Sequence, residues 1–337
     1  PTSSSKIGRE AIAHIQPSSI ADLMELIPGG RATDPSFGAP QEIRLREADP
    51  SSSANYATSA LGTQIQVDGI PISNDANLQY STSYGSIQEY ANVNRGVDTR
   101  AISTDDIESV EIVRGIPSVE YGDLTSGLVK VKRREGGRDL TARFKADMSS
   151  KLFSVGKGFE RKGRGDAERT TLNINADYLT AASDPRNPRQ SYQRLTGSVR
   201  FGRHWQGGSL DYTGSFDDKK SDRDLDNGLG GPVERYKSNY NRTQFAATFA
   251  VEARHRQFFQ SLDLTASFSA EFDRIDRWRF VETGSDFAKT WGTEPGEYDA
   301  VIIPASYDAT LLVDGKPFYG YAKAVATFNA DTERSRN

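Results

Sequence analysis

Three aspartates in one short segment have the spacing that calcium-binding loops use. Asp222, Asp224 and Asp226 stand at alternate positions in the segment DRDLDNG, and Ca²⁺ prefers carboxylate oxygens arranged in this way. The complete loop pattern also needs glycine at its sixth position and glutamate at its twelfth. Asn227 and Val233 occupy those two positions here. The segment therefore predicts a solvated acidic loop, with calcium binding as the weaker alternative.

Residues able to carry out covalent or redox chemistry are scarce. The 337 residues include no cysteine and three histidines, at positions 14, 204 and 255. The lack of cysteine excludes disulfides, cysteine-ligated zinc, iron–sulfur clusters and thiol nucleophiles, and histidines so dispersed do not predict a metal site. The sequence contains no nucleophile elbow, P-loop or dinucleotide fingerprint. We therefore expect neither an enzyme nor a cofactor.

Charged residues cluster in one part of the chain without making the whole chain basic. Glu108, Glu111 and Arg114 lie close together, and residues 130–134 hold a short basic run. The net charge of the chain is −4, which gives no reason to expect a nucleic-acid-binding surface. Charged side chains are rarely buried without partners. Two alternatives therefore stay open for these residues: ionic contacts with another part of the molecule, or a solvated strand face.

The distribution of aromatic residues divides the chain in two. Six of the 33 aromatic residues precede residue 137, and the pair Gly136–Gly137 marks the change. Glycine pairs are common at boundaries between structural units. We therefore predict one domain over residues 1–136 and a second over residues 137–337.

The first domain has the pattern of a small α+β unit. Ser18 and Ser19 can cap a helix that has Asp22 in its first turn, and the proline–glycine–glycine stretch at 28–30 ends it. Strands are predicted at 41–46, 63–68, 107–113 and 127–133. The segments between them are long and rich in serine and asparagine, and loops of that length need support from a surrounding structure.

The second domain shows sustained alternation of apolar and polar residues, in runs longer than ordinary globular strands. It predicts one antiparallel meander of about eight strands, at 139–148, 151–156, 168–180, 192–204, 209–218, 239–253, 258–280 and 317–330. The connection at 205–208 is short, whereas 218–237 and 281–316 are predicted to be long loops. No run approaches 18 apolar residues, which excludes a transmembrane helix but leaves a transmembrane β-barrel open.

Two stretches of the first domain resemble a known family. Residues 63–73, TQIQVDGIPIS, and residues 105–132, DDIESVEIVRGIPSVEYGDLTSGLVKVK, resemble the plug domain of TonB-dependent outer-membrane receptors. The residues of the second stretch that match are Ile107, Glu108, Val110, Glu111, Val113, Arg114, Gly115, Pro117, Ser118, Tyr121, Gly122, Gly127 and Val129. Ser126 departs from the motif, since the family usually has glycine there, and the sequence shows no recognisable TonB box.

The resemblance implies an α+β plug domain over residues 1–136, followed by all-β antiparallel strands of a transmembrane β-barrel over residues 137–337. Such barrels have about 22 strands, so the strands predicted here imply a fragment with the first part of the barrel. The implied activity is TonB-dependent import of a scarce nutrient, such as an iron–siderophore, haem or cobalamin, across the bacterial outer membrane. The implied partners are the TonB energy-coupling complex, outer-membrane lipid and the small-molecule nutrient.

The resemblance also implies roles for individual residues. The structural and gating motif of the plug comprises Asp68, Gly69, Arg114, Gly115, Pro117, Tyr121, Gly122 and Gly127. The candidate ionic contacts between plug and barrel involve Glu108, Glu111 and Arg114 of the plug and Arg143 and Lys145 of the barrel. The candidate ligand-facing residues are Tyr80, Tyr84 and Tyr90.

Two other functions remain open: a soluble or surface-exposed β-rich ligand-binding module, and an oligosaccharide or peptide importer of the same family. Residues 114–118, RGIPS, resemble the siderophore, haem and cobalamin branch more than the carbohydrate-importing branch. A membrane barrel predicts that the apolar strand faces point away from the first domain, whereas a soluble sandwich predicts the reverse. The residues that test this are Leu172, Ile174, Phe245, Phe249, Leu264 and Phe268.

Overall fold

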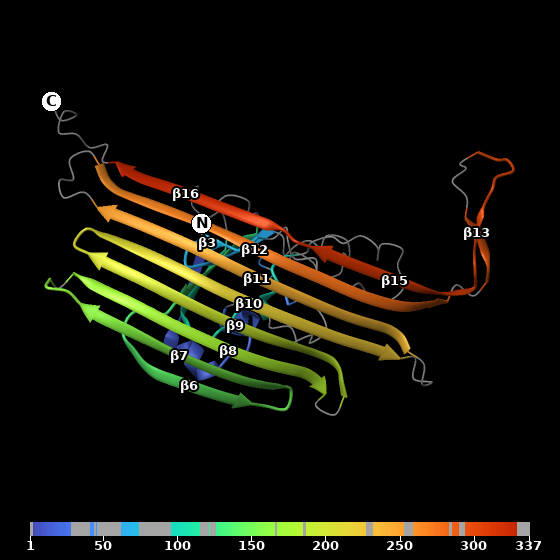
Figure 1. The fold of residues 1–337 in the computed structure, drawn as a ribbon, viewed down its shortest axis with the longest axis horizontal. Helices are drawn as coiled ribbons and strands as arrows, with labels where there is room; N and C mark the ends of the chain where they lie inside the picture. Colours follow the sequence, from blue (N-terminus) through green and yellow to red (C-terminus); the bar gives the residue numbers. More distant parts are fainter. Residues whose placement is uncertain are drawn as a thin grey trace.

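The structure is a computed structural model that describes most of both predicted domains. The described residues are 3–27, 41–43, 45, 62–73, 96–114, 121, 126–165, 167–184, 187–226, 232–252, 259–282, 285–289 and 294–328. Within them, a five-stranded sheet belongs to the N-terminal domain, a nine-stranded sheet follows it, and two short strands pair separately. Figure 1 shows the N-terminal domain behind one face of the nine-stranded sheet, here called the large sheet.

The sheet of the N-terminal domain is mixed. Its strands are β1 (Ser3–Gly8), β2 (Thr63–Val67), β3 (Ile70–Pro71), β4 (Ile107–Arg114) and β5 (Gly127–Arg133), in the order β1-β4-β5-β2-β3. Strand β2 runs parallel to β5, and the other pairs are antiparallel. Three of the four predicted strands are confirmed. The serine-rich sequence of β1 lacks apolar alternation, so sequence analysis does not predict this strand.

The strand predicted at 41–46 is wrong. The described residues of that segment, 41–43 and 45, are in no strand. Ile43 and Leu45 are nevertheless buried in the hydrophobic core, together with Ile65, Ile112 and Val129 of the sheet. In the described residues of the segment, alternate side chains are therefore buried without strand pairing, and the Gln41 carbonyl accepts a hydrogen bond from the Thr99 backbone N–H at 2.8 Å.

Short helices cover this sheet. They are α1 (Arg9–Ile15) and two 3₁₀ helices, η1 (Ile20–Leu26) and η4 (Thr99–Ala101). The predicted cap is confirmed: Ser19 caps η1, and the side chains of Ser19 and Asp22 form a reciprocal capping box. Ile20 and Leu23 of η1 are fully buried in the core.

Asp68 and Gly69 form the predicted two-residue turn between β2 and β3. Their φ angles are 54° and 82°, and a turn of this kind needs positive φ at both central residues. The Asp68 carboxylate accepts a hydrogen bond from the Arg133 backbone N–H at 2.9 Å. The turn thereby ties the end of β5 to the β2–β3 hairpin.

The large sheet is an antiparallel meander, as predicted. Its strands are β6 (Arg138–Ala146), β7 (Ser150–Lys162), β8 (Arg169–Asp184), β9 (Asn187–Trp205), β10 (Gly208–Asp226), β11 (Pro232–Glu252), β12 (Phe259–Glu282), β15 (Ser306–Gly315) and β16 (Phe318–Phe328). Every sequential pair from β6 to β12 is antiparallel and hydrogen-bonded. Trp205 and Gly208 pair across the short connection at 205–208.

The segment predicted to be a long loop at 218–237 is mostly strand. Strands β10 and β11 continue into it, with Asp222 opposite Lys237 and Asp224 opposite Arg235 in the register. Asp222, Asp224 and Asp226 therefore lie in β10 rather than in a loop. The ladder of backbone pairs between β10 and β11 therefore continues through this polar sequence.

The segment predicted as a loop at 281–316 also contains strands. These are β13 (Phe287–Lys289), β14 (Val301–Ile303) and β15, and β13 pairs with β14 in a small hairpin that projects from the sheet (Figure 1). Strand β12 is 24 residues long. One edge of it pairs with β16 along residues 259–270 and with β15 along residues 273–282, so two successive strands share that edge.

The apolar strand faces of the large sheet point away from the N-terminal domain. Ile174, Phe245, Leu264 and Phe268 are between 39% and 49% exposed, and Leu172 and Phe249 are half-buried. Polar residues on the opposite face, including Asn173, Asp177 and Glu271, are buried. This orientation is the one predicted for a membrane barrel and the reverse of a soluble sandwich.

Among the helices that the structure describes, none combines the length and apolar character needed to cross a membrane.

Candidate functional site

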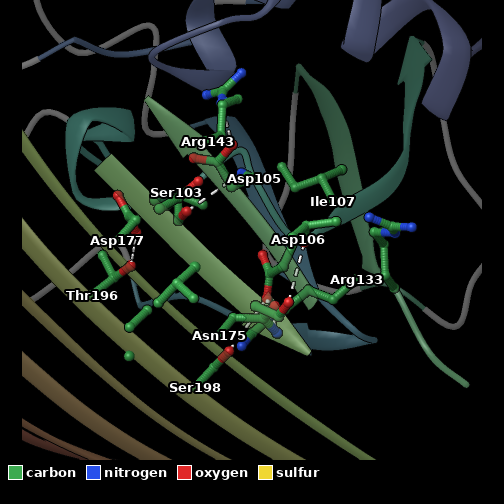
Figure 2. A pocket seen from close by; sticks show the side chains of 18 of the residues that line it. Ser103, Asp105, Asp106, Ile107, Arg133, Arg143, Asn175, Asp177, Thr196 and Ser198 are labelled. Atoms are coloured by element: carbon green, nitrogen blue, oxygen red, sulfur yellow. Dashed lines mark hydrogen bonds and ion pairs between the residues drawn. The ribbon is translucent and has the colours of Figure 1, made fainter. Parts of the chain in front are cut away.

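A charged cavity separates the N-terminal domain from the large sheet. Its volume is about 280 Å³, and Figure 2 shows its lining from close by. The charged side chains that line it are Arg9, Asp105, Asp106, Arg133, Arg134, Arg138, Arg143, Asp177 and Arg242. Two guanidinium nitrogens, Arg138 Nε and Arg143 Nη2, are buried and have no hydrogen-bond partner among the described residues. The cavity is therefore polar and roomy enough for water.

Arg194 on β9 is the most completely buried charged contact between the two domains. Its side chain is 0% exposed, and its Nη2 lies 2.8 Å from Asp177 Oδ2 on the neighbouring strand β8. Its Nη1 donates hydrogen bonds to three backbone carbonyls of the N-terminal domain, those of Ser18, Arg100 and Ile102, at 3.1, 3.2 and 3.1 Å. One arginine of the large sheet thus holds two separate segments of the N-terminal domain.

The Asp177 carboxylate accepts hydrogen bonds from two neighbouring side chains. It accepts hydrogen bonds from Arg194 and from the Thr196 hydroxyl, and its side chain is 3% exposed. Figure 2 shows Asp177 and Thr196 together at the sheet wall of the cavity. Because a buried ion pair is stable only when its remaining hydrogen-bonding groups are satisfied, this arrangement explains how Arg194 can be charged at a fully buried position.

A second ionic contact joins β6 to the N-terminal domain. Arg143 Nε lies 2.8 Å from Asp105 Oδ1. Two residues further along β6, the Lys145 ammonium donates to the Gln16 carbonyl at 2.9 Å and to the Ser18 hydroxyl at 3.0 Å. The structure therefore brings both basic residues that sequence analysis assigns to the barrel into contact with the N-terminal domain.

Asp106 faces the large sheet through neutral partners. Its Oδ2 accepts hydrogen bonds from the Ser198 hydroxyl at 3.3 Å and from the Asn175 amide at 3.4 Å, as Figure 2 shows. Burial raises the pKa of Asp106, and the nearby charge of Arg133 opposes that shift. Burial likewise raises the pKa of Asp105, against the effect of Arg143. Both carboxyl groups therefore bind a proton more readily at the interface than they would in water.

A third ionic contact links the Asp68 turn to β9. Arg200 Nη1 lies 3.3 Å from Asp68 Oδ1, and Arg133 Nε lies 3.3 Å from Asp68 Oδ2. The same Arg200 has its other terminal nitrogen 3.7 Å from Glu135 Oε2, in the connection between β5 and β6. Asp68, which the motif marks as a turn residue, is thus also an ionic contact between the domains.

Tyr121 also contacts both domains. Its ring lies 4.8 Å from the ammonium of Lys130 on β5 and 4.9 Å from that of Lys323 on β16. A lysine ammonium over an aromatic face is attracted by the ring quadrupole. The tyrosine of the sequence motif therefore sits between a cation of the N-terminal domain and a cation of the large sheet.

The acidic residues predicted to contact the barrel pair within their own domain. Glu111 lies 3.8 Å from Lys130, and Glu108 lies 3.9 Å from Arg134. Glu111 and Lys130 are opposite one another in the β4–β5 register, so cross-strand pairing accounts for the first contact. Arg114 ends β4, and its role as an ionic contact stays a prediction.

Several predicted residues lie outside the described part of the chain. These are Gly115, Pro117 and Gly122 of the motif and the candidate ligand-facing residues Tyr80, Tyr84 and Tyr90. Gly127 is described, and a Cβ there would lie 2.6 Å from the Val113 carbonyl oxygen and 2.7 Å from Leu45 Cδ1. Close approach of the backbone therefore explains glycine at this position.

Sequence analysis does not single out Arg194, Arg200 or Asp106. The first two are visible as polar residues at alternate positions of β9, between the exposed residues Leu195, Val199 and Phe201. Period-two alternation identifies the buried face of such a strand. The sequence contains no equivalent signal for which carbonyls of the N-terminal domain those side chains contact.

Comparisons with known proteins agree with this architecture. A family model described as the TonB-dependent receptor plug domain matches residues 1–129. The solved structure of the siderophore receptor PirA from Acinetobacter baumannii matches with a TM-score of 0.50 and 16% identity, covering 95% of this chain and 45% of that one. At this identity the match is evidence of a shared fold alone.

A further solved structure is similar over most of the chain. The ferric yersiniabactin uptake receptor FyuA from Yersinia pestis matches with a TM-score of 0.48 and 11% identity, covering 96% of this chain and 62% of that one. The chain thus spans less than two thirds of the length of both receptors. A search of curated proteins found no match.

Proposed function

Since residues 1–129 are a TonB-dependent receptor plug domain and the strands that follow belong to the same fold, we propose that this protein imports a scarce nutrient across the bacterial outer membrane. The plug blocks the conduit and is displaced to admit the ligand. The matched family consists of receptors rather than enzymes, and import breaks no bond of the ligand.

The observation that carries this proposal is the polar attachment of the plug to the sheet. Arg194, Arg143 and Arg200 hold the plug through ion pairs and backbone carbonyls, next to a polar cavity of about 280 Å³. A typical hydrogen bond contributes a net of about 0.5–1.5 kcal/mol because water can replace either partner. Releasing and redocking a plug attached in this way therefore requires far less free energy than releasing one that packs against the sheet through an apolar core.

The order of the plug strands supports a pulling mechanism. Strand β1 is at the edge of its sheet and pairs with β4 alone among the described strands. A force applied to the N-terminal side of the plug therefore acts first on an edge strand, whose hydrogen bonds open without disrupting the centre of the sheet. The partner proposed to apply that force is the TonB energy-coupling complex.

The outer face of the large sheet supports a membrane location. The rings of Phe245 and Phe268 are tilted with centroids 5.1 Å apart, and those of Phe268 and Phe318 are stacked with centroids 6.0 Å apart. Exposed aromatic and aliphatic side chains on the outer face are typical of lipid-facing barrel strands. We therefore place the protein in the outer membrane, with outer-membrane lipid against this face.

The proposed substrate class is an iron chelate of the siderophore type. Residues 114–118 have the RG-x-P-S form, and the two similar receptors reported above are described as receptors for a siderophore and for ferric yersiniabactin. The experiment is uptake of radiolabelled iron, supplied on a panel of siderophores, by a deletion strain and by the complemented strain, with and without an uncoupler.

We expect uptake of at least one chelate to depend on the gene and to be abolished by the uncoupler. Oligosaccharides serve as the matched control substrates, since another branch of the family imports them. Gene-dependent uptake of an oligosaccharide and of no iron chelate would overturn the proposed substrate class. Gene-dependent uptake that persists with the uncoupler would overturn energy coupling.

A further inference from the structure

Three residues that are far apart in the sequence place metal-binding atoms around one point beside the plug. Glu135 lies in the connection between β5 and β6, His204 near the end of β9 and Asp211 near the start of β10. One imidazole nitrogen and one carboxylate oxygen from each acid all lie within 4.8 Å of one another, and all three residues are half-buried. We call this group the Glu135–His204–Asp211 triad.

The contacts within the triad leave one carboxylate oxygen without a hydrogen bond. His204 Nε2 contacts Glu135 Oε1 closely and lies 3.6 Å from Asp211 Oδ1. A single nitrogen carries at most one proton, so it can donate to only one of the two carboxylates. Asp211 Oδ1 is buried and has no hydrogen-bond partner among the described residues, and such an atom in a native protein requires an explanation.

Two nearby arginines contact Glu135 and not the Asp211 Oδ1 atom. Arg169 Nη2 lies 3.6 Å from Glu135 Oε1, and Arg200 Nη2 lies 3.7 Å from Glu135 Oε2. Both distances are longer than ordinary charge-assisted hydrogen bonds, and both involve Glu135 rather than the orphaned Asp211 Oδ1. A cation bound between the two acids would satisfy that oxygen and reduce their mutual repulsion.

Gly202 leaves space beside two of the triad atoms. On β9 it pairs with Asp211 of β10. A Cβ at Gly202 would lie 2.6 Å from Asp211 Oδ1 and 3.2 Å from His204 Nε2. Any other residue at this position would therefore displace the two side chains, whereas a Cβ at Gly197 on the same strand would meet nothing within 4 Å.

We propose that Glu135, His204 and Asp211 form a binding site for a divalent transition-metal ion of the zinc type. One imidazole nitrogen and two carboxylate oxygens suit such ions. Donor atoms on a tetrahedral zinc ion lie about 3.4 Å apart, close to the 3.6 Å between His204 Nε2 and Asp211 Oδ1. His204 would bind as the neutral imidazole, and water would complete the coordination. This metal site is separate from the nutrient-binding role proposed above.

The site would join the chain that leaves the plug to the sheet that surrounds it. Glu135 lies two residues after the end of β5 of the plug, whereas His204 and Asp211 belong to adjacent strands of the large sheet. A bound ion would therefore fix the end of the plug to the large sheet at a point distinct from the Arg194 contacts. Its effect would be to stabilise the docked plug.

The test is calorimetric titration of the intact protein in detergent with Zn²⁺, in a buffer without chelators. We expect one ion to bind, with affinity reduced at least tenfold by His204→Ala. The matched control is His14→Ala, because His14 is an exposed residue of α1 and lies outside the triad. Gly202→Ala is expected to weaken binding similarly, whereas Gly197→Ala on the same strand leaves it unchanged.

Zinc-edge anomalous scattering from crystals of the unsubstituted protein grown with Zn²⁺ gives an independent readout if a variant fails to fold. A peak between Glu135, His204 and Asp211 would support the site. Absence of Zn²⁺ binding by the unsubstituted protein, or equal binding by His204→Ala and His14→Ala, would overturn the proposal. A peak elsewhere with none at the triad would overturn it as well.

Discussion

Arg143 of the large sheet and Asp105 of the plug form an ion pair of 2.8 Å, while the adjacent Asp106 meets the sheet through a serine and an asparagine. Two neighbouring carboxyl groups therefore cross the same interface with different partners. Burial raises the pKa of both, and among the described residues of the sheet a cation lies within ion-pair distance of Asp105 alone. Their responses to substitution should differ accordingly.

We predict that Asp106→Asn stabilises the docked plug at neutral pH. Because the folded pKa of Asp106 is raised, the folded protein binds the proton more tightly than the unfolded chain does. The stability that comes from protonation is fully present below the unfolded pKa of about 3.9 and is lost as pH rises through the folded pKa. Asparagine resembles the protonated acid and keeps an acceptor for Ser198. The measurement is the thermal unfolding midpoint between pH 4 and pH 8.

The variant should show a higher midpoint than the unsubstituted protein near pH 7 and a flatter pH profile. Asp139→Asn, at an exposed position of β6, is the control. It should change neither the midpoint near pH 7 nor the pH profile. A midpoint that falls in Asp106→Asn at all pH values would show that the charged form of Asp106 is needed for docking.

Arg194→Ala should be the most damaging substitution at the interface. It would leave Asp177 buried without its cation and three plug carbonyls without their donor. Breaking a buried ion pair by removing one partner costs about 3–5 kcal/mol. Limited proteolysis of the plug in detergent, together with chemical denaturation, measures the loss.

Arg203→Ala on the same strand is the matched control, because Arg203 is exposed and should cost little. Arg194→Ala combined with Asp177→Asn should recover part of the loss, since no buried charge then remains. Equal protease resistance in Arg194→Ala and Arg203→Ala would contradict the assigned role.

Gly127→Ala should destabilise the plug sheet by about 1–3 kcal/mol through overpacking. The added methyl group would lie 2.6 Å from the Val113 carbonyl oxygen on the partner strand β4, and a backbone atom cannot move aside as a flexible side chain can. Gly8→Ala is the control, because a Cβ there meets nothing within 4 Å. Denaturation of both variants checks this, and equal midpoints would be inconsistent with close approach at Gly127.

Phe245→Arg should impair insertion into a bilayer if the outer face contacts lipid as proposed. The side chain is 49% exposed in a band of aromatic residues, and an arginine near the bilayer midplane costs about 2–4 kcal/mol in a membrane barrel. Phe159→Arg, nearer the end of β7, should cost less because the penalty falls toward the interface. Refolding into lipid vesicles, followed by the gel shift on heating, compares the two. A greater loss in Phe159→Arg would contradict the depth assignment.

Much of the fold could be predicted from period-two alternation, because side chains of the large sheet alternate between an apolar outer face and a polar inner face. Leu195 and Val199 alternate with Arg194 and Arg200 in this way. Period-two alternation gives no signal where both faces of a strand are polar. The C-terminal part of β10, with Asp222 and Asp224, is therefore predicted to be a loop, although its backbone pairs with β11.

The interface could be predicted in part. Arg143 and Lys145 lie on β6 and contact the plug, and their role as the ionic contacts of plug and barrel stays a prediction. The partners themselves could not be predicted: Lys145 binds a backbone carbonyl and a serine. The Glu135–His204–Asp211 triad was equally invisible, since its members are brought together only by the pairing of β9 with β10 and by the path of the connection after β5.

Arg194 holds the plug by main-chain carbonyls, and this has a consequence for divergence between related proteins. Every residue has a carbonyl, so the three hydrogen bonds from Arg194 depend on the backbone path and not on which side chains stand at positions 18, 100 and 102. The sheet has no such freedom, because it must keep both the arginine and its aspartate. This contact therefore constrains the sequence of the large sheet more than that of the plug. A chimaera that carries a foreign plug of the same backbone path in this sheet should still be held by Arg194.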